Sequence, residues 1–172
     1  MCEVHKPENA KEMIKSFFFE AMRSGWTVSA SKVPITDLPG SKSIPFKQGS
    51  FSLLDYYFLC PTSNSRYGTT VIWIAETPIW VMHYGGWYDR RVISFLKQAL
   101  MRNYNRNVFM GGRGPERLEN DDNTLQYLNN VEQNDFGDFR GHEYIIATSE
   151  QDFGVPAGTK LGKYNYFGGL LL

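Results

Sequence analysis

The chain has 172 residues, of which 42% are hydrophobic and 15% aromatic, and 18 basic residues balance 18 acidic ones. This length and composition are typical of one globular domain with its own core, and a net charge of zero gives no general attraction to nucleic acid or to an anionic membrane. The two cysteines, Cys2 and Cys60, lack C-x-x-C spacing, which argues against a disulfide framework and a structural zinc site.

The sequence shows no targeting or membrane segment. The N-terminus has no basic start followed by a long apolar run, and no stretch approaches the roughly 18 apolar residues that a membrane helix needs. We therefore expect a protein of the reducing cytoplasm, without a metal, a cofactor, a membrane or a nucleic-acid partner.

The first predicted element is a helix. Residues 1–8 form a polar lead-in that we expect to be flexible, and Asn9 is placed to cap the helix. Apolar side chains then recur at helical spacing as far as Gly25, a typical helix stop; they are Met13, Ile14, Phe17, Phe18, Ala21 and Met22.

A run of strands is predicted next. Residues 33–46 contain three prolines and indicate an ordered loop or a sheet edge, because proline cannot donate to a central ladder. Residues 50–60 form an apolar, aromatic strand ended by Pro61. Residues 69–84 read as two strands joined by a short turn at 75–78, which predicts a hairpin.

The second half begins with the clearest helix. Asp89 is placed to cap it, and one apolar face follows, formed by Val92, Phe95, Leu96, Ala99 and Leu100. The Asn-rich and Gly-rich residues 103–116 break the structure, and residues 117–138 are too irregular for an assignment. The segments 141–148 and 159–172 predict two further strands.

Strands in runs between two helices favour an α+β fold, a single domain over residues 9–172 in which a mainly antiparallel sheet carries both helices on one face. No repeat with a period of 20 to 50 residues is present. The segments Tyr-Gly-Gly at 84–86 and Phe-Gly-Gly at 167–169 resemble each other, and we interpret them as two similar strand ends rather than as a repeat.

The aromatic segment 78–91 is a candidate binding site. Strand alternation places Trp80, Met82 and Tyr84 on one face and Ile79, Val81 and His83 on the other. In the functional interpretation, an aromatic pocket receives a flat or apolar ligand at the Gly-Gly end, with residues Trp80, His83, Tyr84, Gly85, Gly86 and Trp87 and with Arg113 as an anion-binding group. In the structural alternative, the rings are core and the glycines turn the chain into the helix at Asp89.

Acid–base candidates are few. Asp55 and Glu143 lie in apolar strands, so each should face solvent, pair with a base or sit in a polar site. His83 and His142 lie near strands without a metal-ligand spacing, whereas His5 lies in the lead-in. Cys60 is interpreted as a half-buried structural thiol.

The motifs, taken in order, resemble a known family. LPGSKSIPFKQGSF, LDYYF, PIWVMHYGG, SFLKQAL, RGPE, GHEYI and YNYFGG are similar to the landmarks of an uncharacterised bacterial domain family found alone or at the C-terminus of Xre-type helix-turn-helix regulators. The resemblance implies a small intracellular α+β domain without an established activity or a known set of catalytic residues. In this chain the first predicted helix follows the short lead-in directly, which leaves no room for a DNA-reading module before it. We therefore do not expect a regulator role of this chain itself.

Three functions remain open at this stage. The first is a non-enzymatic ligand-binding or sensor module built on the aromatic pocket. The second is a hydrolase or transferase for a small molecule that uses Asp55, His83, His142 or Glu143 as acid or base. The third is a protein-interaction module, a homodimer for example, because the last strand ends in three leucines. The expected partner is thus a small molecule or a protein.

Overall fold

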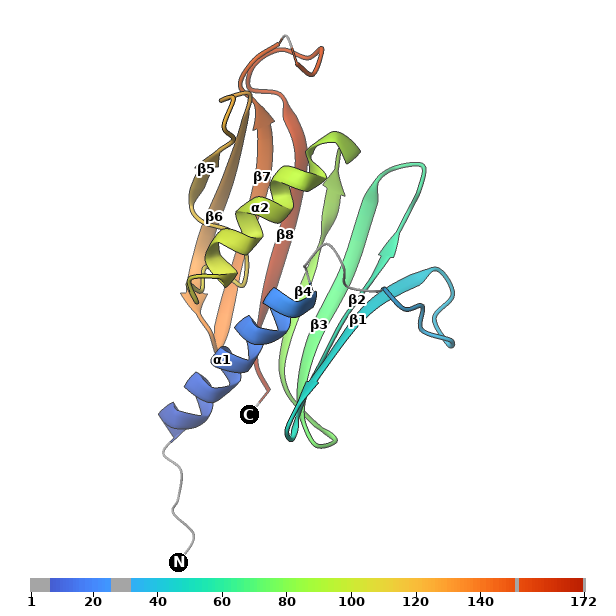
Figure 1. The fold of residues 1–172 in the computed structure, drawn as a ribbon, viewed down its shortest axis with the longest axis vertical. Helices are drawn as coiled ribbons and strands as arrows, with labels where there is room; N and C mark the ends of the chain where they lie inside the picture. The colour runs from blue at the N-terminus through green and yellow to red at the C-terminus, as the bar shows by residue number, and fades with distance from the viewer. Residues whose placement is uncertain (1–6, 26–31, 151, 172) are drawn as a thin grey trace, which may run out of the picture.

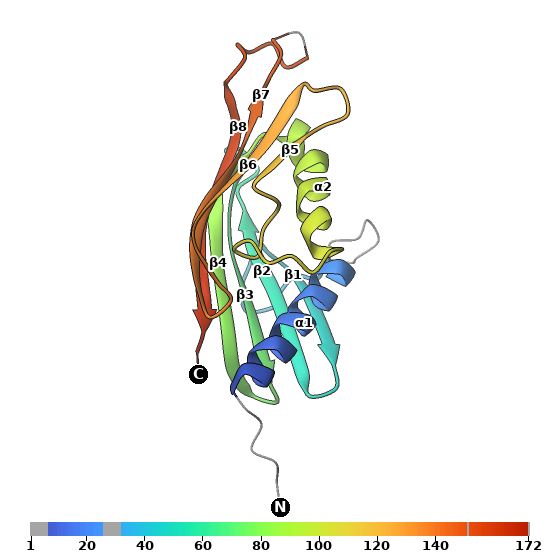
Figure 2. The ribbon, with the colours of Figure 1, turned by 90° about the vertical axis from the view of Figure 1, so that its left-hand side faces the viewer.

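One antiparallel sheet of eight strands runs through the molecule, and two helices lie on one of its faces (Figures 1 and 2). The structure is a computed structural model and describes residues 7–25, 32–150 and 152–171. The order of the strands is β1-β2-β3-β4-β8-β7-β6-β5. The predicted α+β class, with two principal helices on a mainly antiparallel sheet, is therefore confirmed.

The elements follow one another in two similar series. The first comprises α1 (Pro7–Gly25), β1 (Ser41–Gln48), β2 (Phe51–Leu59), β3 (Ser65–Ile74) and β4 (Thr77–Tyr88). The second comprises a short 3-10 turn (Arg90–Val92), α2 (Ile93–Tyr104), β5 (Arg117–Glu119), β6 (Leu125–Asp135), β7 (Asp138–Ala147) and β8 (Lys160–Leu170).

The first helix differs from the prediction at its start. It begins at Pro7, so Asn9 lies inside the helix and does not cap it, because proline is well suited to a first helical turn. Most of the expected lead-in, residues 1–6, lies outside the described residues. The predicted apolar face is confirmed for Phe17, Phe18 and Met22, which are buried against the sheet, but not for Met13, which is 49% exposed.

The strands of the first half agree with the prediction. The proline-rich segment contributes β1, which is the edge strand of the sheet and pairs Pro45 with Leu54 of β2. β3 and β4 form the expected hairpin, with Ala75 in its turn at a positive φ of 53°. The hairpin brings the aromatic segment into the centre of the sheet.

In the second half, Asp89 accepts a hydrogen bond from the backbone N–H of Arg91 at 2.9 Å and caps the short turn that leads into α2.

The unassigned residues 117–138 form β5, β6 and the start of β7. Their strand signal is weak because the inward position of Asn129 is polar although it is buried. β7 and β8 lie at the two segments in which strands were predicted, 141–148 and 159–172, with β7 beginning earlier and β8 ending at Leu170.

Each half of the chain is one helix followed by four antiparallel strands, and the last strands of the two halves pair at the centre of the sheet. Tyr84 of β4 lies opposite Tyr166 of β8. The segments 84–86 and 167–169 belong to these two strands, but Tyr84 faces the core whereas Phe167 is exposed on the other face, so the similar segments do not occupy equivalent positions.

The Gly-Gly pairs do not face each other. Gly85 and Gly86 pair with Asn165 and Tyr164, because β4 and β8 run in opposite directions. β4 continues through both glycines to Tyr88, so they do not turn the chain into α2. At Gly86 the φ of 149° and the nearby carbonyl oxygen of Lys163, 1.9 Å from where a Cβ would lie, require glycine.

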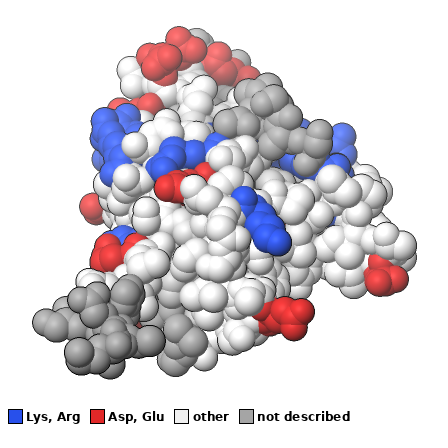
Figure 3. Space-filling model, turned by 60° about the horizontal axis from the view of Figure 1, so that its bottom comes forward, with Lys and Arg blue, Asp and Glu red and all other residues white. Residues whose placement is uncertain are grey.

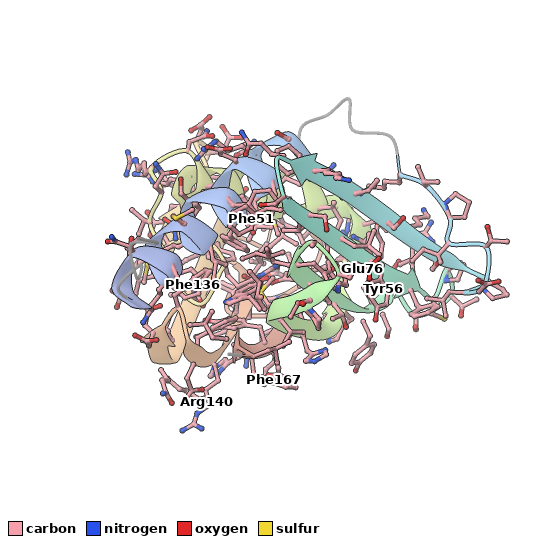
Figure 4. All side chains as sticks on the ribbon, turned by 90° about the horizontal axis from the view of Figure 1, so that it is seen from below. Phe51, Tyr56, Glu76, Phe136, Arg140 and Phe167 are labelled. Carbon is pink, nitrogen blue, oxygen red and sulfur yellow. The ribbon has the colours of Figure 1, made fainter. Side chains whose placement is uncertain are left out.

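The core lies between the helices and one face of the sheet, which we call the inner face. Trp80 is fully buried there, stacks on Phe136 and Phe139 with ring centroids 5.2 and 5.4 Å away, and donates its indole N–H to the carbonyl of Phe136 at 2.9 Å. Figure 4 shows Phe136 on the side of α1, whereas Phe167 and Arg140 point away from it. The face that carries Phe167 is called the outer face, and no described helix covers it (Figure 2).

Neither helix of the described chain combines the length and apolar character that a membrane-spanning helix needs. Figure 3 shows one group of acidic side chains along the top edge of the view, with basic and further acidic side chains in separate smaller groups below it. This distribution agrees with the balanced charge of the chain.

Candidate functional site

The inner face holds a buried ion pair under α2. Glu143 of β7 is fully buried and accepts hydrogen bonds from the guanidinium of Arg113 and from the hydroxyl of Tyr127. Tyr88 donates a third, at 3.2 Å. Burial disfavours the charged form of a tyrosine, and the neighbouring carboxylate adds to this, so the pKa of both phenols lies well above 10.0 and both remain donors.

Asp55 of β2 lies on the same face, 2% exposed, in a second polar cluster. Its Oδ1 accepts hydrogen bonds from Thr70 at 3.0 Å and from Tyr84 at 2.8 Å, whereas its Oδ2 has no hydrogen-bond partner in the described part of the chain. Desolvation raises the pKa of this carboxyl, although both hydrogen bonds and the charge of Arg113 oppose the shift.

The Asp55 cluster depends on a glycine in the intervening strand. Gly68 of β3 lies between β2 and β4, and a Cβ there would be 2.5 Å from the hydroxyl oxygen of Tyr84. The missing side chain lets the Tyr84 ring cross β3 and reach Asp55.

The second half of the chain repeats this arrangement. Tyr166 of β8 donates its hydroxyl hydrogen at 2.6 Å to the side-chain oxygen of Asn129 on β6. Gly141 of β7 lies in the path, and a Cβ there would be 2.5 Å from the hydroxyl oxygen of Tyr166. The two halves therefore share a tyrosine, a glycine and an Asp or Asn on their fourth, third and second strands.

Beside the ion pair, a cavity of about 20 Å³ lies between α2 and strands β2, β3, β4 and β8. Its lining combines three cations with tyrosines and aliphatic side chains: Arg66, Lys97, Arg113, Tyr57, Tyr84, Tyr164, Ile93 and Leu96. The Nε atoms of Arg113 and Arg66 are buried and have no hydrogen-bond partner among the described residues. We call this space the inner cavity.

The outer face carries a row of side chains that runs across five strands. The ladder places Thr69, His83, Phe167 and Arg140 side by side, and Tyr56 continues the row on β2. In the next row, Tyr67 lies opposite Gly85, and a Cβ at Gly85 would be 2.1 Å from the Tyr67 ring. The glycine therefore leaves room for that ring to lie flat on the sheet.

These rows enclose two adjoining hollows, which together form the outer groove. The first is about 440 Å³ and is lined by Tyr56, Phe58, Tyr67, Gly68, Thr69, His83, Tyr84, Gly85, Asn165 and Phe167. The second is about 600 Å³ and is lined by Val81, His83, Phe167, Leu170, Leu171 and residues 137–140 and 168–169. His83 and Phe167 belong to both, with ring centroids 5.2 Å apart, and Phe167 is 59% exposed.

The sheet divides the predicted binding residues between its two faces. Trp80 belongs to the core, so it lines neither hollow, and Trp87 is 41% exposed on the outer face beyond both. His83, Tyr84 and Gly85 line the first hollow. Tyr84 also lines the inner cavity, together with Arg113. The expected alternation is confirmed from Trp80 to Tyr84, so these side chains do not converge on one pocket. Ile79, expected on the face of His83, is instead buried in the core, where the ladder shifts its register.

The predicted acid–base candidates are divided in the same way. Asp55 and Glu143 lie on the inner face, whereas His83 and His142 lie on the outer one. The Nδ1 atom of His83 is hydrogen-bonded to Thr69 at 3.0 Å, and the Nε2 atom of His142 to Asn130 at 3.1 Å. Neither of the two histidines in the described ranges therefore meets a buried carboxylate, and His5 lies outside those ranges.

Two further expectations concern metal binding and Cys60. Among the described residues, no group of three or more His, Cys, Asp or Glu side chains could hold a metal ion. Cys60 is exposed, which corrects the expectation of a half-buried thiol. It lies just beyond the end of β2, where Pro61 and a turn keep the chain at the surface.

Sequence reasoning missed several residues of both sites. Phe167 stands on a predicted strand, whereas Tyr67 precedes the strand predicted from residue 69, and pairing across strands decides that both flank His83. Arg66 and Lys97 belong to separate elements, a strand and a helix, and only the packing of α2 on the sheet brings them together. Arg66 precedes the strand that was predicted from residue 69, and Lys97 is a polar position of an amphipathic helix, so neither residue gives a signal of its own.

Comparison with known proteins gives a family but no activity. No curated protein matches the chain, and no solved structure matches it. The family model described as Domain of unknown function (DUF5680) matches residues 55–169, which include both buried carboxylates, the outer row and β8 except its last residue. Because the match spans more than half of the sequence, the chain belongs to this family of domains of unknown function.

Proposed function

We propose that the protein is a non-enzymatic ligand-binding module whose outer groove takes a neutral small molecule with a flat ring face. The observation that carries the proposal is the first hollow: about 440 Å³ in volume and bordered by Phe58, Tyr67 and Phe167, which are 42%, 65% and 59% exposed. Ligand sites commonly have volumes of about 300 to 1,000 Å³ and mainly aromatic or apolar walls.

The lining of the first hollow favours a neutral ligand. No Lys, Arg, Asp or Glu is among its lining residues in the described chain. Thr69, His83 and Asn165 offer hydrogen bonds without a fixed charge, and exposed rings stack on flat faces of ligands. Since Nδ1 of His83 already bonds Thr69, its Nε2 remains for a ligand group. A saccharide or an uncharged heterocycle fits this chemistry.

The division of the titratable groups supports binding over catalysis. General acid–base chemistry needs two groups within reach of one reacting bond. The first hollow contains His83 but no carboxylate, because Asp55 and Glu143 lie on the other face of the sheet and Asp138 lines only the second hollow. A sensor or carrier role requires only the groove.

A thermal-shift screen of the full chain against sugars, nucleosides, amino acids and acyl compounds tests the proposal. A ligand at about one hundred times its Kd stabilises the folded state by about 2.7 kcal/mol. We expect a neutral ring compound to stabilise the wild type, and Phe167→Ala and Tyr67→Ala to remove that stabilisation. Trp87→Ala is the matched control, because Trp87 is an exposed aromatic residue of the same face outside both hollows. Equal stabilisation of all variants would show that the groove is not the site.

Self-association is the second candidate function. Its specific observation is that Phe58, Tyr67, Trp87 and Phe167 are all exposed on one sheet face that no described helix covers, and large exposed apolar areas often mark interfaces. Sedimentation at two concentrations distinguishes the two functions. A dimer that Phe167→Asp dissociates would favour an interface, whereas a monomer at both concentrations would leave the groove to a small molecule.

A further inference from the structure

The inner cavity lies on the opposite face of the sheet from the outer groove, and its chemistry is different. Arg113 forms its floor, 2% exposed, with the guanidinium carbon 5.6 Å from the ring centroids of both Tyr84 and Tyr164. Arg66 and Lys97 are half-buried at its border. The cavity therefore gathers three cations between tyrosine rings.

The hydrogen bonds of Arg113 leave part of its guanidinium unused. One terminal nitrogen donates to Glu143, but the buried Nε–H has no acceptor within the described ranges of the chain. A buried donor without an acceptor costs free energy of about 1–3 kcal/mol. An acceptor in the cavity would remove that cost.

Arg66 provides an independent second observation. Its Nε is also buried and without a hydrogen-bond partner in the described chain, although Arg66 belongs to β3 and Arg113 to the loop after α2. Two guanidinium groups from distant segments thus border one small space, each with an unused donor. Buried unpartnered polar groups are rare in folded proteins, and each calls for an explanation.

The charges around the cavity select an anion. Glu143 compensates Arg113, but neither Arg66 nor Lys97 forms an ion pair with a described acidic residue. Two positive charges thus remain at the border. Guanidinium groups bind carboxylate and phosphate through paired, charge-assisted hydrogen bonds, which fits their unused donors.

We infer that the inner cavity binds one oxyanion group, a carboxylate or a phosphate, between Arg113, Arg66 and Lys97. A volume of about 20 Å³ is little more than one water needs, so the anion enters as Arg66 and Lys97 move outward. Both side chains are half-exposed and can make that movement. The inference is independent of the proposed function, which concerns the other face.

Titration calorimetry of the full chain with sodium phosphate, and separately with sodium acetate, at an ionic strength held constant with sodium chloride tests this site. We expect saturable binding of at least one anion. Arg66→Gln and Lys97→Gln should each weaken binding about tenfold, because each removes a charge-assisted contact. Lys47→Gln, at an exposed position of β1, is the matched control and should bind as the wild type does. Phe167→Ala should also leave anion binding unchanged.

Glycerol phosphate distinguishes a free ion from the head group of a larger ligand: tighter binding than inorganic phosphate indicates a larger ligand, and equal binding indicates the free ion. Arg113 variants would disturb Glu143, so the floor is tested in the wild type by following the Nε–H signals of the arginines in ¹H–¹⁵N spectra. The Arg113 signal should move on addition of the anion. The inference is wrong if neither anion binds saturably, if both border variants bind like the wild type, or if only exposed arginines respond.

Discussion

Tyr84 and Tyr166 lie opposite each other in the central strand pair, and each donates its hydroxyl hydrogen to a buried side chain on the second strand of its own half. The acceptors are Asp55 and Asn129. Since both tyrosines cross a glycine of the third strand, the shared geometry follows from the repeated topology of the two halves. The second half carries a neutral amide where the first carries an acid.

The repeated glycines should be required for stability. Gly68→Ala and Gly141→Ala each place a Cβ 2.5 Å from a tyrosine hydroxyl oxygen and close to a backbone carbonyl oxygen. Overpacking of this kind costs about 1–3 kcal/mol, measurable as a lower midpoint in urea denaturation. Asn165→Ala, on the exposed face of β8, is the control and should change stability by less than about 0.5 kcal/mol. Unchanged stability of the glycine variants would contradict the crossing geometry.

The contribution of Asp55 to stability should decrease as the pH rises, whereas the contribution of a salt-bridged surface carboxylate increases. Desolvation raises its pKa in the folded state, so the folded protein binds this proton more tightly than the unfolded chain. Its contribution is therefore present below the unfolded value near 3.8 and is lost as the pH rises through the folded pKa.

Asp55→Asn removes that titration while it keeps the size of the side chain. The free energy of unfolding of Asp55→Asn relative to wild type should increase as the pH rises from about 4 toward 7. Urea denaturation at several pH values measures the difference, in which the contributions of the other groups cancel. A difference that is constant with pH would mean that the folded pKa of Asp55 is not raised.

The Glu143 carboxylate should be essential to the fold because it compensates Arg113. Glu143→Gln leaves a buried guanidinium without a counter-charge, and breaking a buried pair in this way costs about 3–5 kcal/mol. Arg117→Gln breaks the exposed pair of Arg117 with Glu119 and should cost at most about 1 kcal/mol. Thermal unfolding of both variants tests the contrast, and similar losses would refute it.

Much of the fold could be predicted because each pattern has a local cause. The apolar spacing behind Phe17 and Phe18, the hairpin around Ala75 and the cap at Asp89 all rest on residues close in sequence. The start of α1 at Pro7 could not be predicted, because Asn9 provides a competing cap signal inside the same turn. The strands of residues 117–138 could not be predicted either, because the buried Asn129 departs from the usual apolar alternation.

The candidate sites were predictable only in part for a different reason. Alternation correctly separates Trp80 from His83, but a single strand cannot show which face is covered by helices. Tyr67 and Phe167 reach His83 through the pairing of β3, β4 and β8, and the acceptor of the buried Arg113 belongs to a strand thirty residues away. Such long-range relationships leave no mark on local sequence.

The two tryptophans of β4 should behave as core and surface residues. Trp80→Ala removes a fully buried ring that stacks on two phenylalanines, and such truncations cost about 3–5 kcal/mol. Trp87→Ala removes a side chain that is 41% exposed and should cost much less. Denaturant midpoints give both values. Acrylamide quenching of single-tryptophan proteins provides the check, since Trp87 should be quenched readily and Trp80 hardly at all.

Cys60 should react rapidly with alkylating reagents near neutral pH. Hydrogen bonds from Ser63 and Thr62 lower the pKa of its exposed thiol from 9.0 to about 6, and the thiolate is the reactive form. In a Cys2→Ser background, the rate of alkylation by iodoacetamide should therefore rise between about pH 5 and 7, with its midpoint near pH 6. Thr62→Val and Ser63→Ala should move that midpoint upward. The same protein in urea is the control, because unfolding removes the hydrogen bonds and restores the ordinary thiol. A folded midpoint equal to the unfolded one would show that the turn does not stabilise the thiolate.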